Sequence, residues 1–284
     1  LGHTKRINAV KEELGLEFEC ESIDVRYDPR RRGIYAKEFH KLRGRKGLTM
    51  EDAIRLLKTT TYFGPMMVHM GDADGYLGGI SHNYPDIVKP CLQTIGPAID
   101  THRIVGMYMM TVNGQLMFIG DATINIYPDS RTLAEIAVQT AKVARRFGVK
   151  PKVAMLSFSN FGTSGEMRTD RIEEAIEMAR ELDPGIVIDG PMQADTALID
   201  EIQENYPFME FDGPANVLIC PNLASANIAY KLLQRVAGAE MTGPILEGLA
   251  KPAHVLQRDD SVREVVHMAA ICAVDAQRYA TQKL

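Results

Sequence analysis

The sequence predicts an α/β protein in which mainly parallel sheets are covered by helices on both faces. Short apolar runs of strand length alternate with amphipathic stretches of helical length, which is typical of βαβ units. The chain has 284 residues, which is long for one domain and comfortable for two, because domains cluster near ~100–200 residues. Hydrophobic residues make up 45% of the chain, so a large core can form and disorder is excluded as the main state.

The composition excludes several functional classes. A net charge of -5 argues against a general nucleic-acid binder, and no run approaches the ~20 apolar residues of a membrane helix. The four cysteines are scattered without a C-x-x-C motif, so we expect no disulfide framework, no zinc site and a reducing cytoplasm. The chain opens Leu-Gly-His-Thr without a signal segment, so we expect a piece of a longer protein.

The first third of the chain alternates between helical and strand-like patterns. Thr49 followed by Asp52 indicates a capped helix start, and Pro85 suits a first helical turn. In chain order we expect a helix at Thr4–Glu13, a strand at Phe18–Val25, helices at Tyr35–Leu42 and Thr49–Leu57, a glycine-rich strand at Ala73–Ile80 and a helix at Pro85–Ile95.

The middle of the chain carries the clearest local signals. Two apolar runs, His102–Val112 and Gln115–Ala122, are joined by Asn113-Gly114, the strongest short signal for a β-hairpin. Thr132 and Glu135 form the pattern of a capping box before a helix that ends near Phe147. A regular alternation then predicts strands at Val153–Phe158, Gly185–Asp189 and Ala215–Cys220, and helices at Arg168–Leu182, Asp195–Glu204, Ser225–Val236 and Ser261–Gln282.

Three of these strands are followed by loops rich in Ser, Thr, Gly and Asn, and ligands of parallel sheets lie beyond the carboxyl ends of strands. The loop Ser157–Gly165 suits a phosphate or another anion, or is an ordinary loop of helix-capping residues. Asp189, Gln193 and Asp195 are candidates to orient a substrate, although Asp195 suits the N-cap of the next helix better.

Other motifs have equally plain alternatives. The glycines between Gly75 and Gly79 do not match a dinucleotide fingerprint, and close backbone packing explains them better. The segment Arg26–Lys46 holds nine Lys or Arg against two acids, which suits a small polyanion or simply a solvated surface. Neither metal-ligand spacing of histidines nor a serine nucleophile elbow is present in the sequence. Arg258, just before the last helix, is a plausible anion clamp, while Ser261 and Glu264 read as a capping box.

Longer motifs carry a family resemblance. They read Asp212-Gly-Pro-Ala-Asn-Val-Leu-Ile-Cys-Pro-Asn-Leu, Ser225-Ala-Asn-Ile-Ala-Tyr-Lys-Leu-Leu-Gln-Arg, Gly243-Pro-Ile-Leu-Glu-Gly-Leu-Ala-Lys-Pro and Asp189-Gly-Pro-Met-Gln-Ala-Asp. The chain resembles phosphate acetyltransferases (phosphotransacetylases) over nearly its whole length. The resemblance implies two three-layer α/β/α domains with a cleft between them, one formed by residues 1–98 plus 256–284 and the other by residues 99–255. It also implies that a first strand and helix are missing.

This chain differs from that family at several residues of the active-cleft motif. Family members carry Lys-Pro-x-Asn-Asp-Leu-Ser-Arg-Gly, which reads Lys251-Pro-Ala-His-Val-Leu-Gln-Arg-Asp here, so Gln257 replaces the serine. The family's base, an Asp, falls on Glu264, two of its arginines match Arg43 and Arg258, and a third is Lys89. Losing one oxyanion donor costs ~10²–10³ in rate, and lysine lacks the bidentate fork of arginine. These departures predict an impaired cleft.

The same departures resemble the phosphotransacetylase-like domain that follows the catalytic half of hybrid bacterial malic enzymes. This resemblance implies a regulatory and assembly domain that binds acetyl-CoA or coenzyme A, with NAD(P) and Mg or Mn confined to an absent malic half. The expected contacts to acetyl-CoA or its phosphates are Arg43, His82, Lys89, Ser159, Ser164, Asn227, Arg235, His254, Gln257 and Arg258.

Two rival hypotheses remain at this stage. One is a working phosphate acetyltransferase that uses Glu264 as base and Arg43 and Arg258 as clamps. The other is a structural dimerisation domain without a ligand. In each case the family implies a homodimer or a higher homo-oligomer, and in the malic-enzyme case the chain's own malic half is a further partner. No nucleic acid or membrane is expected as a partner.

Overall fold

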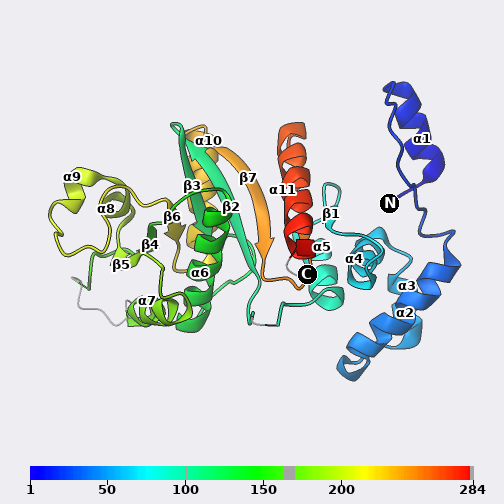
Figure 1. Ribbon diagram of the computed structural model, residues 1–284, viewed down its shortest axis with the longest axis horizontal. Coiled ribbons are helices and arrows are strands. Elements are labelled where there is room, and N and C mark those ends of the chain that lie inside the picture. The colour runs from blue at the N-terminus through cyan, green and yellow to red at the C-terminus, as the bar shows by residue number, and fades with distance from the viewer. Residues whose placement is uncertain (100, 163–169, 282–284) are drawn as a thin grey trace. The chain divides into compact units, whose positions relative to one another are not determined.

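The computed structural model describes residues 1–99, 101–162 and 170–281 and divides into two units (Figure 1). Unit 1 comprises Leu1–Ile99 and Leu249–Leu284, and unit 2 comprises Asp100–Gly248. The sequence-based division placed the second boundary after residue 255, whereas the structure keeps residues 249–255 in unit 1. The reason is strand pairing, because Ala253–Val255 forms a strand that pairs within unit 1.

Unit 1 contains a parallel pair of strands, β1 (Tyr76–Gly78) and β8 (Ala253–Val255), in which Tyr76 lies opposite Ala253. Since both strands run in the same direction, the loops that follow them lie at one edge of the pair, and each loop leads into a helix. These helices are α5 (Tyr84–Thr94) and α11 (Val262–Thr281). The remaining elements of unit 1 are α1 (Thr4–Glu13), α2 (Pro29–Arg43), the short 3₁₀ helix η1 (Gly44–Lys46), α3 (Met50–Leu56) and α4 (Thr60–Met70).

Unit 2 is built on a six-stranded mixed sheet with the order β5-β4-β6-β3-β2-β7. The pairs β5–β4, β4–β6 and β6–β3 are parallel, whereas β3–β2 and β2–β7 are antiparallel. The strands are β2 (Val105–Val112), β3 (Gln115–Gly120), β4 (Val153–Leu156), β5 (Ile188–Met192), β6 (Val217–Ile219) and β7 (Glu240–Glu247). The helices are α6 (Ser130–Arg146), α7 (Asp170–Leu182), α8 (Ala194–Leu198), α9 (Asp200–Gln203) and α10 (Leu223–Val236).

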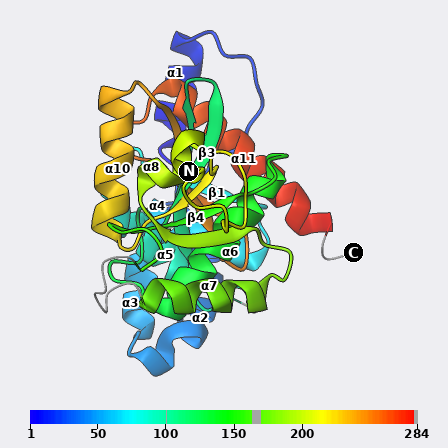
Figure 2. The ribbon, with the colours of Figure 1, turned by 90° about the vertical axis from the view of Figure 1, so that its left-hand side faces the viewer.

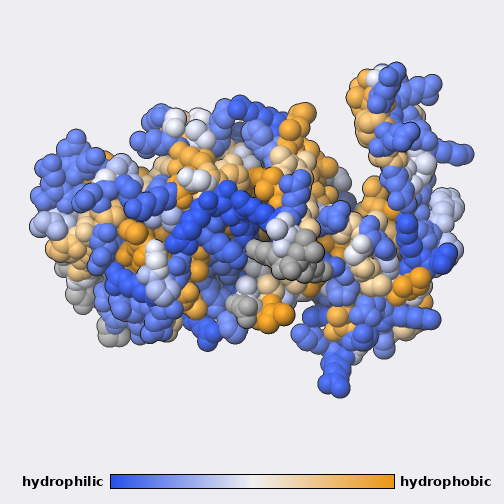
Figure 3. Space-filling view, viewed as in Figure 1, coloured by the Kyte–Doolittle hydropathy of each residue, from blue (hydrophilic) through white to orange (hydrophobic). Residues whose placement is uncertain are grey.

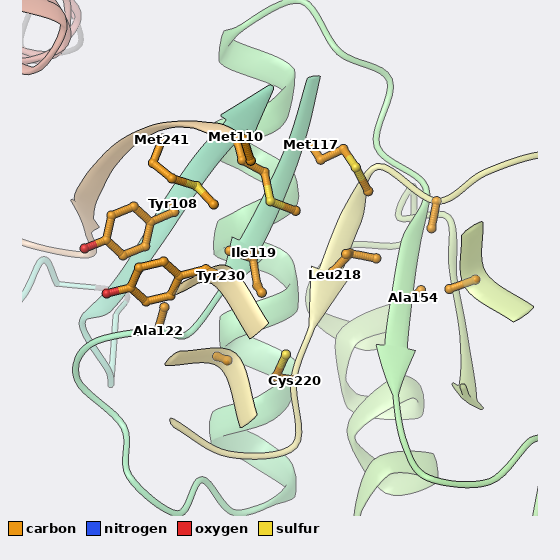
Figure 4. Packing of buried hydrophobic residues seen from close by; sticks show 14 of the residues in the cluster. Tyr108, Met110, Met117, Ile119, Ala122, Ala154, Leu218, Cys220, Tyr230 and Met241 are labelled. Atoms are coloured by element: carbon orange, nitrogen blue, oxygen red, sulfur yellow. The ribbon is translucent and has the colours of Figure 1, made fainter. Parts of the chain in front are cut away.

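Helices cover both faces of this sheet, which gives unit 2 three layers (Figure 2). On one face, Tyr230 of α10 stacks on Tyr108 of β2 with ring centroids 4.3 Å apart, within the buried cluster of Figure 4. On the other face α6 approaches closely, because a Cβ on Gly120 would lie 2.5 Å from Oγ1 of Thr140. The expected α/β fold with parallel strands is therefore confirmed.

Several expected local signals are confirmed. Asn113 and Gly114 join β2 and β3 with φ of 49° and 79°, as the hairpin signal predicts. Thr49 caps α3 by accepting the N–H of Asp52 at 3.1 Å. In contrast, Asp129 rather than Thr132 is the N-cap of α6, since its carboxylate accepts the N–H of Thr132. The helix therefore begins before the expected capping box.

Other expectations about the elements are wrong. Phe18–Val25 is not a strand, because none of the described strands pairs with it, although Ile23 and Val25 are buried. Helix α4 was not expected, since Gly64-Pro65 lies within it. The strands β7 and β8 were also missed. Helix α1 buries none of its residues, and apolar atoms are visible on its surface in Figure 3.

Candidate functional site

The carboxyl edge of the β1–β8 pair brings two loops into contact in unit 1. The N–H of Leu256 donates to the carbonyl of Gly78 at 2.8 Å. Gly79 has a φ of +128°, and a Cβ there would lie 2.4 Å from the carbonyl oxygen of Leu256. Only glycine permits this approach, so the packing interpretation of the glycine cluster is confirmed. The loop that carries His82 therefore lies against the chain that leads to Gln257.

The loop after β8 is a tight turn that presents Arg258. The N–H of Gln257 donates to Oδ2 of Asp260 at 2.7 Å, and the N–H of Asp260 donates to the carbonyl of Gln257 at 3.2 Å. Arg258 lies at the tip of this turn, is exposed, and has no hydrogen bond or ion pair among the described residues. Its guanidinium is available to an anion just before the N-terminus of α11, where the helix dipole adds positive potential.

Asp260 is a residue of this edge that the sequence analysis missed. Burial raises the pKa of its carboxyl group to about 6, with the negative charges of Glu264 and Asp259 acting in the same direction and the N–H of Gln257 acting against them. A raised pKa in a loop at the end of parallel strands is typical of functional positions. The sequence holds no signal for it, because burial depends on the packing of distant segments.

Glu264, the expected base, is held in a helix cap. The N–H of Ser261 donates to Oε2 of Glu264 at 2.6 Å, and the N–H of Glu264 donates to Oγ of Ser261 at 3.2 Å. This reciprocal pair is the capping box that the sequence predicted, and it is confirmed. One carboxylate oxygen of Glu264 is thereby engaged by the backbone.

His254 lies inside unit 1 rather than at its surface. Its side chain is 1% exposed, and Nε2 lies 3.2 Å from Oδ2 of Asp275 on α11. The pair ties β8 to α11. A direct contact between His254 and a ligand, which the sequence analysis expected, does not fit this burial.

Arg43 and Lys89 lie on two helices of unit 1. Arg43 ends α2, and its charge acts to lower the pKa of Tyr62, which burial raises. The hydroxyl of Tyr62 donates to Oε1 of Gln93 on α5 at 2.8 Å. Lys89 is exposed on α5. Within the described parts of the chain, neither cation has a carboxylate partner.

The expected contacts in unit 2 come from the segment after β4 and from α10. Ser159 is buried after β4, whereas Ser164 lies outside the described residues. Asn227 is near the start of α10 and exposed Arg235 is near its end, about 12 Å farther along the axis at 1.5 Å per residue. A ligand that contacts both Asn227 and Arg235 must therefore extend about 12 Å along α10.

The described polar side chains after β4 and around β5 in unit 2 hydrogen-bond to the protein's own backbone. Asp189 accepts N–H groups from Gly190 and Glu210, at 2.8 and 2.9 Å, so its carboxylate holds the backbone. The side-chain Oδ1 of Asn160 accepts the N–H of Gln193 at 2.7 Å. Gln193, not Asp195, occupies the N-cap position of α8, so the expected capping by Asp195 is wrong.

A second missed carboxylate, Asp121, anchors the loop after β3. It is 3% exposed and accepts backbone N–H groups from Thr123, Ile124 and Asn125. Burial raises its pKa and these hydrogen bonds oppose that rise. We interpret Asp121 as a structural residue, because its oxygens are occupied by the chain itself.

The described residues hold neither a metal-binding cluster nor a membrane-spanning helix. Among the described residues, no group of three or more His, Cys, Asp or Glu side chains is arranged to hold a metal ion. None of the described helices has the length and apolar character needed to cross a membrane.

Comparison with known proteins adds to this geometry. A phosphate acetyltransferase of Corynebacterium glutamicum is 37% identical over 278 residues, which cover 97% of this chain and 84% of that protein. The crystal structure of a phosphotransacetylase from Streptococcus pyogenes matches 98% of this chain and 85% of its own, with a TM-score of 0.90 and 34% identity. An NADP-dependent malic enzyme of Escherichia coli is 37% identical over 93% of this chain, but only 35% of that enzyme is covered.

These findings correct the expected function. The hypothesis of a regulatory malic-enzyme domain with little or no transferase activity is wrong, because relatives named phosphate acetyltransferase match nearly the whole chain at 35–37% identity. The hypothesis gave too much weight to two substitutions. A glutamine amide donates a hydrogen bond as a serine hydroxyl does, and lysine keeps the positive charge of arginine. The two substitutions therefore keep a hydrogen-bond donor at position 257 and a positive charge at position 89.

The family is shown by a match along nearly the whole chain. A family model described as phosphate acetyl/butaryl transferase matches residues 1–273, and this range includes Arg43, both strands of the β1–β8 pair, and Arg258. The chain therefore belongs to the phosphate acetyl/butaryl transferase family.

Proposed function

We propose that this chain is a phosphate acetyltransferase, which interconverts acetyl-CoA plus phosphate with acetyl phosphate plus coenzyme A. The observation that carries the proposal is the match of 97% of the chain to a relative of that name. The exposed guanidinium of Arg258, without a partner among the described residues, supports it because the reaction needs a cation for phosphoryl oxygens.

The reaction requires a base for the thiol, cations for the phosphoryl group and a donor for the oxyanion. Arg258 and Arg43 are the proposed phosphate clamps, and Lys89 contributes a further positive charge. The side-chain amide of Gln257, which precedes Arg258, is the proposed donor to the oxyanion. Coenzyme A and acetyl-CoA are substrates in this proposal, and none of its steps uses a metal or a nicotinamide cofactor.

The test is formation of acetyl-CoA from acetyl phosphate and coenzyme A by the purified chain. We expect a turnover on the order of 10 s⁻¹, which is typical of enzymes. Arg258→Ala is expected to lower kcat/KM by ~10²–10³, in the range measured for loss of one transition-state contact. Arg6→Ala is the matched control, since Arg6 is an exposed arginine of α1 and is expected to leave the rate unchanged. Absence of turnover by the unaltered chain would refute the proposal.

We also propose a second copy of the chain as a partner. Ile228, Leu232 and Val236 form an apolar row along one face of α10, with exposed fractions of 60%, 57% and 81%. A row of this kind is favourable when a two-fold axis lays it against its own copy. Light scattering is expected to give twice the mass of one chain, and Leu232→Asp is expected to halve that mass. An unaltered chain that is monomeric at micromolar concentration would contradict this proposal.

A further inference from the structure

The charges of the chain are distributed unevenly along the sequence. Residues 26–46 hold nine Lys or Arg and two acids, whereas residues 170–212 hold 13 acids and two arginines. The whole chain has a net charge of only -5. One segment is therefore strongly basic, another is strongly acidic, and the rest of the chain is nearly balanced.

The basic segment presents its cations on one exposed face of α2. This basic face consists of Arg30, Ile34, Lys37 and Lys41, which are all exposed and follow one another at intervals of four, three and four residues. Such intervals place side chains on one side of a helix, and the buried residues of α2 lie on the opposite side. Arg30 and Lys37 have no partner among the described residues, and Lys41 lies 3.5 Å from a carboxylate oxygen of exposed-side Glu38.

The acidic segment presents a face of the same design on α7. This acidic face consists of Asp170, Glu174, Glu177 and Glu181, which are exposed and again follow at intervals of four, three and four residues. At 1.5 Å per residue, both faces are about 16 Å long. Within the part of the chain that the structure describes, Asp170 and Glu181 have no partner. The two faces therefore match in length and spacing and are opposite in charge.

The existing contacts of the acidic face are weak. Oε2 of Glu174 accepts the hydroxyl of Ser130 at 2.7 Å, and Oε1 of Glu177 accepts Nη1 of Arg180 at 2.8 Å. Both contacts are exposed to solvent, where ion pairs and hydrogen bonds exchange readily with water and with other partners. Solvated faces usually carry both signs of charge, so solvation alone gives no reason for one sign along each helix.

We propose that the basic face of one copy of the chain docks against the acidic face of a second copy. Complementary charges steer such an encounter and fix its register, and here the chain itself supplies a surface that matches the basic face in length and spacing. Because every copy carries both faces, the contact runs head to tail and can repeat from copy to copy. It uses α2 and α7, and it is distinct from the apolar row of α10.

The experiment measures the mass of the assembly by light scattering at two salt concentrations. The contact consists of exposed charges and is weak, so the chain is kept at hundreds of micromolar, well above the concentration that tests the α10 contact. The Debye length is ~10 Å in 0.1 M salt and ~3 Å in 1 M salt, so the higher salt screens the facing charges. We expect the mass in 0.1 M salt to be at least about twofold greater than the mass in 1 M salt.

Two charge-reversal variants test the pairing of the faces. Lys37→Glu with Lys41→Glu makes both faces acidic, and Glu177→Lys with Glu181→Lys makes both faces basic. Each variant alone is expected to lose the salt-sensitive mass, because like charges then meet. An equal mixture of the two variants is expected to regain it, since unlike faces meet again. All four substitutions in one chain are expected to regain it as well.

The matched control changes the net charge equally at other exposed lysines. Lys58→Glu with Lys150→Glu is expected to keep the salt-sensitive mass, because neither lysine belongs to the basic face. Circular dichroism and Tm verify that each variant is folded. A mass equal at both salt concentrations, a mixture no heavier than its separate variants, or an equal loss in the control would overturn the proposal. Binding of duplex DNA by the unaltered chain without any salt-sensitive change in its own mass would assign the basic face to another partner and would also overturn it.

Discussion

Gly79→Ala tests the close contact between the two loops of the candidate site. Gly79 has a φ of +128°, and the added Cβ would lie 2.4 Å from the carbonyl oxygen and 3.1 Å from the nitrogen of Leu256. Ordinary contact begins at 3.4 Å, so the chain after β8 must shift by about 1 Å. That shift stretches the 2.8 Å hydrogen bond between Leu256 and Gly78.

The expected cost has two parts. A positive φ costs an L-residue ~1–2 kcal/mol, and weakening a buried hydrogen bond costs ~1–3 kcal/mol more. Gly47→Ala isolates the first part, because Gly47 has a φ of +89° and no atom within 4 Å of the added Cβ. We therefore expect Gly79→Ala to lower the free energy of unfolding by ~2–5 kcal/mol and Gly47→Ala by only ~1–2 kcal/mol.

Urea unfolding followed by circular dichroism measures both variants, and the acetyl-CoA assay measures their activity. Gly79→Ala is expected to lower kcat as well, since the displaced chain carries Gln257 and Arg258. Gly47→Ala is expected to leave kcat unchanged. Equal losses of stability in the two variants, within ~0.5 kcal/mol, would refute the argument from close approach.

Three further predictions concern stability. Phe118→Ala is expected to cost ~3–5 kcal/mol in urea unfolding, because Phe118 is fully buried, whereas Tyr127→Ala, at an 82% exposed position, is expected to change stability by less than ~0.5 kcal/mol. Asp260→Asn is expected to stabilise the fold at pH 7.5. The pKa of Asp260 is about 6 in the folded chain and 3.8 in the unfolded chain, so folding disfavours the ionised carboxylate. The gain in the free energy of unfolding should vanish as the pH falls below 3.8. Arg26 lowers the pKa of Asp24 to about 2, so this carboxylate stabilises the fold above pH 3.8, and its contribution is lost as the pH falls toward 2. Asp24→Asn should remove this pH dependence of the free energy of unfolding, which acid unfolding curves measure.

Local signals in the sequence succeed where one short segment determines the structure. Asn113-Gly114 forms its hairpin because both residues accept a positive φ, and Ser261 with Glu264 forms its capping box within four residues. The alternation of Phe18–Val25 fails as a strand signal, because a strand also needs a neighbouring strand to pair with. Short strands such as β8 are missed because their own sequence carries no strand signal. The three residues of β8 form a strand only because β1, far away along the chain, pairs with them.

The candidate site shows the same limit. Family motifs predict functional roles for Arg43, Arg258 and Glu264. They do not show that one carboxylate oxygen of Glu264 is engaged in a helix cap. The raised pKa of Asp260 and the burial of His254 result from tertiary packing, which no run of residue types reports. The weight given to Gln257 was an error of chemistry rather than of pattern, because its amide remains a donor.

The insertion of unit 2 between the two segments of unit 1 has a consequence for synthesis on the ribosome. Residues 100–248 emerge as a continuous stretch, so the six-stranded sheet can be completed while translation continues. Tyr76, in contrast, must wait for Ala253 to leave the ribosome before β1 finds its partner. The loop that carries Arg258 is thus assembled last, and a chain terminated before Ala253 would contain a finished six-stranded sheet but no β1–β8 pair.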